Sequence, residues 1–254
     1  MMSALFEADS LRSNQHLLNT TIIDEKLVAS ISGLLNRSKI PCVLWGNYLL
    51  TIHGVPSIVD SIDFIVPDGN IAASVLALQN QGLGSCTEPK SCTAIAERRP
   101  SPPPAAHFHI DSDFTVSIYK QSSALWFLPN LKLSSKSSSP PNIILASDSQ
   151  LPPPRLGRGH GKFQNSTPQV YIPSAHCLLE AYIRLLARTH GHRYEFFWMA
   201  MITYIEEYVD GDGLLDEASL EARCRAFYSA LKACEKPVAL LLEDLEASFA
   251  GTEN

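Results

Sequence analysis

The spacing of apolar residues divides the chain into a first part that mixes helices and strands and a second part of helices alone. In the first part, some segments repeat apolar residues every three or four positions, and others are short β-branched runs. The former spacing is typical of amphipathic helices and the latter of strands. We predict helices at 21–37, 47–53 and 69–83, and extended segments at 42–45, 57–67, 107–111, 114–119 and 124–128. The mixture predicts an α/β (α+β) core.

Beyond residue 170 the pattern is helical throughout. Ser174 suits an N-cap before the first helix, and Pro237 suits the first turn of the last one. Four apolar stripes at helical spacing cover 178–186, 197–208, 220–231 and 238–249. These stripes predict a C-terminal helical bundle packed on the α/β core.

Segments rich in Pro, Ser and Gly interrupt this pattern, and such segments cannot supply a packed core. We therefore expect three regions: a flexible segment at 1–20, an α/β domain over 21–170, and a C-terminal helical domain over 171–250. Within the α/β domain, weakly ordered loops are predicted near 84–106, 133–142 and 148–168.

Composition narrows the function classes. The 254 residues include 45% hydrophobic and 18% charged residues, a globular balance, and 20 basic against 26 acidic residues give a net charge of −6. Few, dispersed basic residues disfavour a nucleic-acid partner. The longest apolar runs are too short to cross a membrane, and the N-terminal stretch lacks the features of a secretion signal, so we expect a cytoplasmic or nuclear protein.

The six cysteines are scattered along the chain, and none forms a C-x-x-C pair. Cys86 and Cys92 are the closest pair and fall in a predicted loop. Free, reduced thiols are the interpretation that we prefer to a zinc site.

The most informative stretch combines a glycine turn with an acidic strand. It consists of Trp45-Gly46-Asn47, a spacer of thirteen residues at 48–60, and Ser61-Ile62-Asp63-Phe64. This pattern resembles the nucleotidyltransferase superfamily, which places a hydrophobic residue, Gly and then Gly or Ser before a spacer and the sequence Asp-hydrophobic-Asp/Glu-hydrophobic. The superfamily includes polymerase β, antibiotic-modifying adenylyltransferases and small transferases of toxin–antitoxin systems. Residues 53–56 and 172–188 are similar to further parts of the last two branches.

The resemblance implies a mixed sheet flanked by helices, and a site that transfers a nucleotidyl group. Such sites need two or three carboxylates to hold divalent metal ions, so Mg²⁺ is implied if the chain is active. It also implies that Gly46, Asn47 and Ser61 lie where a nucleotide binds, and that Asp63 is a catalytic metal ligand.

The motif departs from the superfamily pattern at two positions. Asn47 replaces the small residue after the glycine, and Ser61 replaces the first carboxylate of the acidic pair. Asp60 is adjacent but has the opposite strand parity, so it points to the other side unless a bulge intervenes. The metal site is thus predicted to be short of negative charge.

The candidate for a further carboxylate is the segment at 107–113. His107, His109, Asp111 and Asp113 share parity, so an extended chain would present them on one face, with Asp111 and Asp113 as catalytic or metal-binding partners of Asp63. Two alternatives remain: a metal site of another kind, or a solvated polar edge, which we favour.

Two other stretches resemble a phosphate-binding loop and a calcium-binding loop but lack residues that such loops need. The stretch at 156–162 is rich in glycine, but Phe163 stands where a phosphate loop needs Ser or Thr, which favours a solvated linker. The stretch at 210–216 is acidic, but a calcium loop aligned on Gly213 places Tyr208 and Ser219 at its first and twelfth positions, where carboxylates are needed. We therefore interpret it as a turn between helices with Asp216 as a cap.

Three functional hypotheses follow. The first is a nucleotidyltransferase-fold protein with an impaired site, which binds a nucleotide, a small molecule or a protein. The second is an active Mg²⁺-dependent nucleotidyltransferase that acts on a small molecule or a protein. The third is a purely structural interaction protein.

Overall fold

The computed structural model describes residues 22–88, 91–96, 99–133, 142–164 and 167–250. Its contacts divide the chain into two compact units: 1–99, 103–140 and 144–172 form the first, and 100–102, 141–143 and 173–254 form the second. The predicted flexible segment at 1–20 and most of the predicted loop at 133–142 lie outside the described residues.

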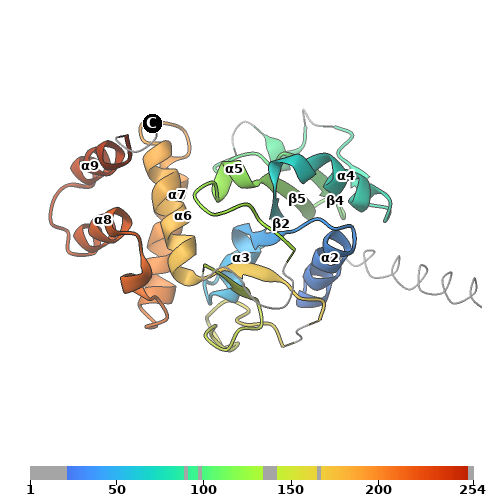
Figure 1. Ribbon diagram of the computed structural model, residues 1–254, viewed down its shortest axis with the longest axis horizontal. Helices are drawn as coiled ribbons and strands as arrows, with labels where there is room; N and C mark the ends of the chain where they lie inside the picture. Colours follow the sequence, from blue (N-terminus) through green and yellow to red (C-terminus); the bar gives the residue numbers. More distant parts are fainter. Residues whose placement is uncertain (1–21, 89–90, 97–98, 134–141, 165–166, 251–254) are drawn as a thin grey trace, which may run out of the picture. The chain divides into compact units, whose positions relative to one another are not determined.

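The first unit is built on a five-stranded mixed sheet with the strand order β1-β2-β5-β4-β3 (Figure 1). Its strands are β1 (Val43–Trp45), β2 (Ser61–Val66), β3 (Gly84–Ser85), β4 (Ala106–His109) and β5 (Thr115–Lys120). β2 and β5 run parallel, whereas the other neighbouring pairs are antiparallel. This arrangement confirms the predicted α/β class.

The α-helices that accompany the sheet in the described part of this unit are α2 (Glu25–Arg37), α3 (Gly46–Ile52), α4 (Ile71–Gln79) and α5 (Gln121–Ala124). Two 3₁₀ turns, η1 (Asp68–Asn70) and η2 (Thr93–Ile95), lie in the connections. α2 begins at an N-cap, because the Asp24 carboxylate accepts a hydrogen bond from the Leu27 N–H at 2.9 Å. α3 and α4 pack on β2 and β5 respectively, so the helices bury the apolar residues that alternate along those strands.

The extended segment predicted at 124–128 is wrong. Residues 121–124 form the short helix α5, and a turn follows at 126–127. The side chain of Gln121 is buried and donates through Nε2 to the carbonyl of Pro129 at 3.0 Å, while its Oε1 accepts from the Leu131 N–H. One buried amide thereby replaces the hydrogen bonds that a strand would have supplied.

The glycine-rich segment at 151–163 packs on the first unit, although the sequence predicts a weakly ordered linker there. The N–H of Gly159 donates to Gly54 O at 2.8 Å, and that of Gly161 donates to Thr51 O at 2.9 Å. A Cβ at Gly159 would approach Thr51 O to 2.4 Å. The glycines are therefore required for close backbone approach to the end of α3, rather than for flexibility.

A separate two-stranded sheet, β6 (Ile143–Leu145) with β7 (Tyr171–Pro173), lies where the chain passes between the units. The second unit is helical, as predicted. It contains α6 (Ala175–Arg188), α7 (Glu195–Tyr204), α8 (Ala222–Lys232) and α9 (Val238–Ala250), with a π-helical turn η3 (Ile205–Asp210) and a 3₁₀ turn η4 (Glu217–Ser219).

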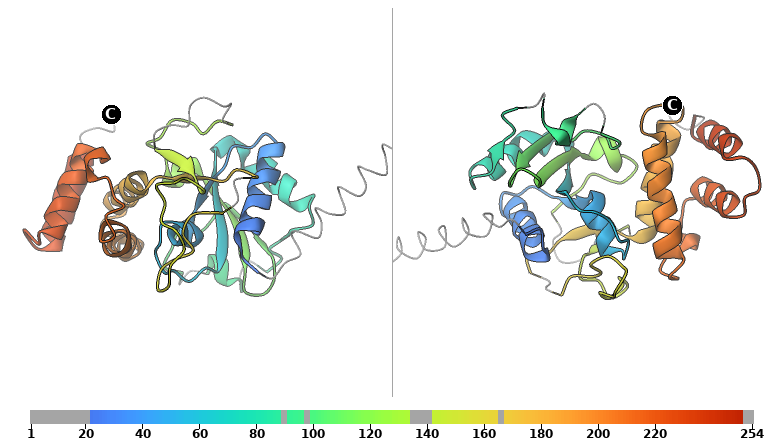
Figure 2. Two further views of the ribbon diagram at one scale, coloured as in Figure 1. Left: turned by 90° about the horizontal axis from the view of Figure 1, so that it is seen from below. Right: turned by 180° about the vertical axis from the view of Figure 1, so that it is seen from behind.

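Within this unit, α6 packs against α7, and α8 packs against α9 (Figure 2). Asp216 caps η4 by accepting from the Ala218 N–H at 3.1 Å, which confirms the predicted turn. Among the described residues, no helix is both long enough and apolar enough to span a membrane.

Candidate functional site

A row of polar side chains crosses one face of the sheet in the first unit. Asp63 of β2 pairs with Ser117 of β5, and Ser117 pairs in turn with His107 of β4. Directly paired residues project from the same face, so these three side chains share one face within about 10 Å. All three are buried. The position beside Asp63 on β5, where a third carboxylate would complete a metal site, is thus a serine.

Asp63 is only 5% exposed. Its Oδ2 accepts a hydrogen bond from the Ser61 hydroxyl at 3.1 Å, whereas Oδ1 is buried without a hydrogen-bond partner in the described structure. An unpartnered buried oxygen destabilises the fold by about 1–3 kcal/mol and marks a position that a donor or a cation would satisfy.

Burial dominates the electrostatics of this carboxylate and raises the pKa of Asp63 to about 6. The Ser61 hydrogen bond and the positive charge of Arg99 lower the pKa, and the negative charge of Asp60 raises it. The Ser117 hydroxyl lowers it too, without forming a hydrogen bond of ordinary length.

Asp60 and Asp63 contact the same serine side chain. The Ser61 hydroxyl that bonds Asp63 also lies 3.4 Å from Asp60 Oδ1, so a single hydroxyl contacts both carboxylates. The backbone of Asp60 directly precedes β2 and accepts a hydrogen bond from the Thr115 N–H of β5 at 3.1 Å. We call Asp60, Ser61 and Asp63 the carboxylate cluster.

Residue 46 must be a glycine because it lies against the side chain of Asp63. α3 begins at this glycine, whose φ is +70°, and a Cβ there would lie 2.1 Å from Asp63 Oδ2. Asn47 has a structural contact instead of a free side chain, because its Nδ2 donates to Ile58 O at 3.0 Å and so ties the start of α3 to the segment before β2. Of the positions that the resemblance implies for nucleotide binding, Gly46 and Ser61 therefore contact the acidic centre, while Asn47 braces the loop.

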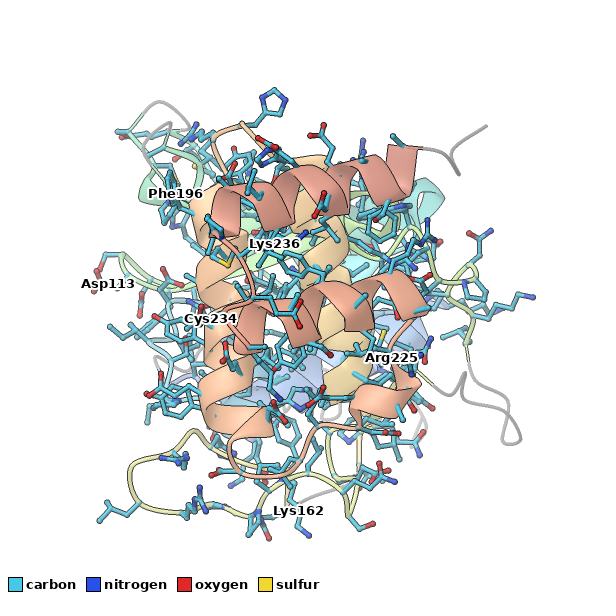
Figure 3. All side chains as sticks on the ribbon, turned by 90° about the vertical axis from the view of Figure 1, so that its left-hand side faces the viewer. Asp113, Lys162, Phe196, Arg225, Cys234 and Lys236 are labelled. Carbon is cyan, nitrogen blue, oxygen red and sulfur yellow. The ribbon has the colours of Figure 1, made fainter. Side chains whose placement is uncertain are left out.

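Asp111 and Asp113 do not share the sheet face with His107, which corrects the parity prediction. β4 ends at His109, and Asp111 Oδ1 closes the following turn by accepting from the N–H groups of Asp113 and Phe114, each at 2.8 Å. Asp113 is exposed, and Figure 3 shows it on an outlying loop. The extended geometry on which parity depends ends at His109, four residues before Asp113.

The two histidines do share a face, but with cysteines rather than aspartates. His107 Nε2 lies 3.2 Å from Cys92 Sγ, and His109 Nε2 lies 3.5 Å from the same sulfur. Cys86 completes a group of four whose ligand atoms all lie within 4.8 Å of one another. We call these four residues the thiol–imidazole cluster. The sequence interpretation of Cys86 and Cys92 as an unremarkable pair of free thiols overlooks this convergence.

Arg99 is a further residue that sequence reasoning missed. Its guanidinium donates to Ala94 O at 2.6 Å, and its charge acts on both Asp63 and His107. Its place in a polar, proline-rich stretch suggests only a surface loop, and no local signal indicates that it lies near a buried acid.

These residues do not fit the divalent metal centre that nucleotidyl transfer needs. Mg²⁺ binds oxygen ligands in octahedral geometry and keeps several waters, whereas Asp63 is almost closed off by its neighbours. Among the described residues, the only group of three or more acidic, thiol or imidazole side chains that converges is the thiol–imidazole cluster. The centre thus has two carboxylates, one of them buried, with the hydroxyl side chains of Ser61 and Ser117 beside Asp63.

Neither models of protein families nor curated proteins match the chain. Several solved structures resemble the chain in fold. A crystal structure of an antigenic nucleotidyltransferase-like protein from Paracoccidioides brasiliensis has 13% identity and a TM-score of 0.41, with 85% of this chain and 90% of that chain covered.

Two structures of the antibiotic-resistance factor ANT(2'')-Ia also match. The complex with adenylyl-2''-tobramycin has 10% identity and a TM-score of 0.40, covering 80% of this chain and 94% of that one. The solution structure has 12% identity and a TM-score of 0.34, covering 81% and 92%. TM-scores below 0.5 fix neither a family nor an activity, so the proposals below rest on the residues and their geometry.

Proposed function

We propose that this chain is a nucleotidyltransferase-like protein with impaired nucleotidyl transfer, which acts by binding a nucleotide weakly or by binding a protein partner. The motif at 45–64 supports the relation to the superfamily. The proposed loss of transfer rests on one observation: the side chains beside Asp63 are the hydroxyls of Ser61 and Ser117. An active site of this superfamily needs further carboxylates beside such an acid.

Charge balance supports this proposal. Catalysis by this superfamily depends on metal ions that neutralise the triphosphate and activate the attacking hydroxyl. Here the positive charge of Arg99 acts on the buried carboxylate of Asp63 and lowers its pKa, whereas burial raises it. A resident cation of the protein thereby supplies part of the positive charge that a divalent ion would otherwise provide.

Retained transfer activity is the second candidate, and one observation favours it. Asp60 and Asp63 contact the same hydroxyl, and Asp63 Oδ1 has no hydrogen-bond partner in the described structure. Mg²⁺ in enzymes is commonly bound through one or two carboxylates together with the phosphates of the substrate, so two neighbouring carboxylates are enough for the protein's share of one ion if Asp63 becomes accessible when substrate binds. Under this candidate, Asp60 and Asp63 hold the ion, and the substrate is a small molecule or a protein side chain.

Calorimetry separates the two candidates. ATP, CTP, GTP and UTP are titrated into the full chain with and without Mg²⁺ or Mn²⁺, and transfer from labelled triphosphates is followed in parallel. We expect weak binding that the metal does not strengthen, and no transfer. Metal-dependent transfer that Asp63→Ala abolishes and Asp113→Asn preserves would overturn the proposal, since Asp113 lies on the exposed turn after β4.

A gain-of-function variant sharpens the test. Ser61→Asp restores the acidic pair of the superfamily pattern, so it should strengthen metal-linked nucleotide binding if the remaining pocket is intact. Ser30→Asp, on the exposed side of α2, adds the same charge away from the site and is the control. Circular dichroism establishes that each variant is folded. Equal metal-linked affinity in Ser61→Asp and the parent chain would show that position 61 does not limit binding.

A further inference from the structure

The thiol–imidazole cluster gathers four ligands from two segments of the first unit. His107 and His109 are two residues apart on β4 and therefore project from the same face. β3 pairs with β4 so that Gly84 lies opposite His109, which places Cys86, two residues further on, beside the histidines. Cys92 immediately precedes η2 and returns the loop to the same point.

The distances within the cluster match a tetrahedral site. Zinc lies about 2.3 Å from a cysteine sulfur and about 2.0 Å from a histidine nitrogen, so sulfur and nitrogen ligands of one ion are about 3.6 Å apart. The measured distances from Cys92 Sγ to His107 Nε2 and His109 Nε2 are 3.2 and 3.5 Å. The two imidazole rings meet edge to face, at 74° and 5.3 Å between centroids, so both Nε2 atoms can approach one point without the rings clashing.

We propose that Cys86, Cys92, His107 and His109 form a structural zinc site. Two thiolates and two neutral imidazoles around Zn²⁺ give a site with no net charge, since the two thiol protons pass to solvent on binding. A neutral complex suits this partly buried position, where Cys92 and His107 are 7% and 9% exposed. Two sulfur and two nitrogen ligands select zinc over Mg²⁺ or Ca²⁺, which take oxygen ligands.

Four protein ligands fill the tetrahedron and leave no position for substrate, which is the arrangement of structural rather than catalytic zinc. A catalytic cysteine is a different arrangement, because it needs one cysteine with an accessible sulfur and one histidine that acts as its base. Here two cysteines and two histidines converge, and the central sulfur of Cys92 is buried.

The position of the site explains what the metal does. The connection from β3 to β4 follows a strand of only two residues, and the buried side chains among its described residues include Cys92 and Ala94. Small segments with too little apolar area are commonly fixed by a metal ion. The zinc ion joins this connection to β4, and the same connection carries Arg99, whose charge acts on Asp63. A hollow of about 300 Å³, lined in part by Cys86, Cys92 and His109, gives the ion a route from solvent.

Metal content and cobalt spectroscopy test the proposal directly. The full chain, purified under reducing conditions, should carry about one zinc ion by plasma mass spectrometry. After zinc is removed, Co²⁺ should give the intense visible bands of a tetrahedral ion together with a thiolate-to-cobalt charge-transfer band. Reduced apo-protein that gives no such spectrum would overturn the proposal, and this test requires no variant to fold.

Matched variants assign the ligands. Cys86→Ser and His109→Asn alter partly exposed ligands and should abolish zinc retention and the charge-transfer band or weaken them severely. Cys234→Ser and His192→Asn change exposed residues of the second unit and should leave both unchanged (Figure 3 shows Cys234). Full retention of metal by Cys86→Ser and His109→Asn would overturn the assignment. A Cys86–Cys92 disulfide whose reduction restores no Co²⁺ binding would identify a redox pair instead and would also overturn it.

These outcomes are independent of nucleotide binding. Zinc content is measured without a nucleotide, so the zinc proposal can fail while the proposed function stands, and the reverse.

Discussion

The carboxylate cluster and the thiol–imidazole cluster lie on the same face of one sheet, yet they differ in how completely their ligands are assembled. The first contributes two carboxylates linked through Ser61, and one oxygen of Asp63 has no hydrogen-bond partner in the described structure. The second brings four soft ligands within 4.8 Å of one another. The motif that is easiest to see in the sequence thus marks the less complete site.

The difference arises from where the ligands come from. The carboxylate cluster lies within four residues of the chain, at 60–63, around the start of β2, so the residue type at a single position such as 61 decides how many acidic ligands are present. The thiol–imidazole cluster depends on β3–β4 pairing to bring Cys86 to His109. Local spacing detects the first kind of site, whereas the second becomes visible only when strands are paired.

The largest expected effect is on the free energy of unfolding, which zinc and magnesium should change differently because each ion tests one of the two clusters. Zinc at a free concentration 1,000-fold above its dissociation constant should raise the free energy of unfolding of the apo-protein by about 4 kcal/mol. Millimolar Mg²⁺ should leave it unchanged, because the carboxylate cluster lacks a third acid. Urea denaturation followed by circular dichroism measures both. Stabilisation by Mg²⁺ that Asp63→Asn removes would show instead that the carboxylate cluster is a working metal site.

Gly46→Ala is expected to lower the free energy of unfolding by about 3 kcal/mol, through both backbone strain and the clash with Asp63 Oδ2. Gly82→Ala is the matched control, because Gly82 also has a positive φ, +89°, but no atom within 4 Å of its Cβ position. The excess loss in Gly46→Ala measures the clash alone. Equal losses in the two variants would mean that the carboxylate moves aside freely.

Asp63→Asn is expected to raise the free energy of unfolding by about 2 kcal/mol at pH 7 and to change it little at about pH 3. The folded-state pKa of about 6 exceeds the ordinary value of 3.8, so the native state holds the proton more tightly than the unfolded chain. Wild-type stability is therefore full below about pH 4 and falls as the pH rises through 6, and the amide removes this fall. Urea denaturation across this range measures the effect.

Asp68→Asn serves as the control, because the pKa of Asp68 is shifted in the opposite direction to that of Asp63. Desolvation acts to raise the pKa of Asp68, but hydrogen bonds from the Ser122 hydroxyl and N–H outweigh it and hold the pKa below its ordinary value. Its contribution to stability is present at neutral pH and is lost on acidification. If both variants gave the same pH profile, the buried environment of Asp63 would not be the cause.

Ser61→Ala has the smallest expected effect, a loss of about 1 kcal/mol at pH 7. The Ser61 hydroxyl lowers the pKa of Asp63, so its removal should move that pKa further above 6. The carbon-13 chemical shift of the Asp63 carboxyl, followed against pH, measures the change. An unchanged titration would show that the hydroxyl bonds Asp60 rather than Asp63.

Much of the fold could be predicted from periodicity alone. The strand around Asp63, the helices at 25–37 and 175–188, and the cap at Asp216 follow local rules that sequence expresses directly. The segment at 151–163 was missed because its glycines serve close packing on α3, and composition cannot distinguish this role from flexibility. Residues 121–124 were missed because the buried amide of Gln121 overrides the β-propensity of the residues that follow.

The candidate site could be predicted only in part. Asp63 and Gly46 were identified from their spacing, and the structure places them in direct contact. Parity misplaced Asp111 and Asp113, because β4 ends at His109 and alternation does not hold in the turn that follows. Arg99 depends on the tertiary course of a long connection, for which a single sequence contains no signal.

The contact between Gly46 and Asp63 also affects how homologous sequences should be compared. A glycine at this position is a steric requirement of the acid behind it, so its presence in a sequence reports on packing and is no evidence of activity. Relatives that remain active are better recognised by an acidic residue at the positions equivalent to Ser61 and Ser117, where side-chain chemistry rather than backbone shape decides whether an ion is held.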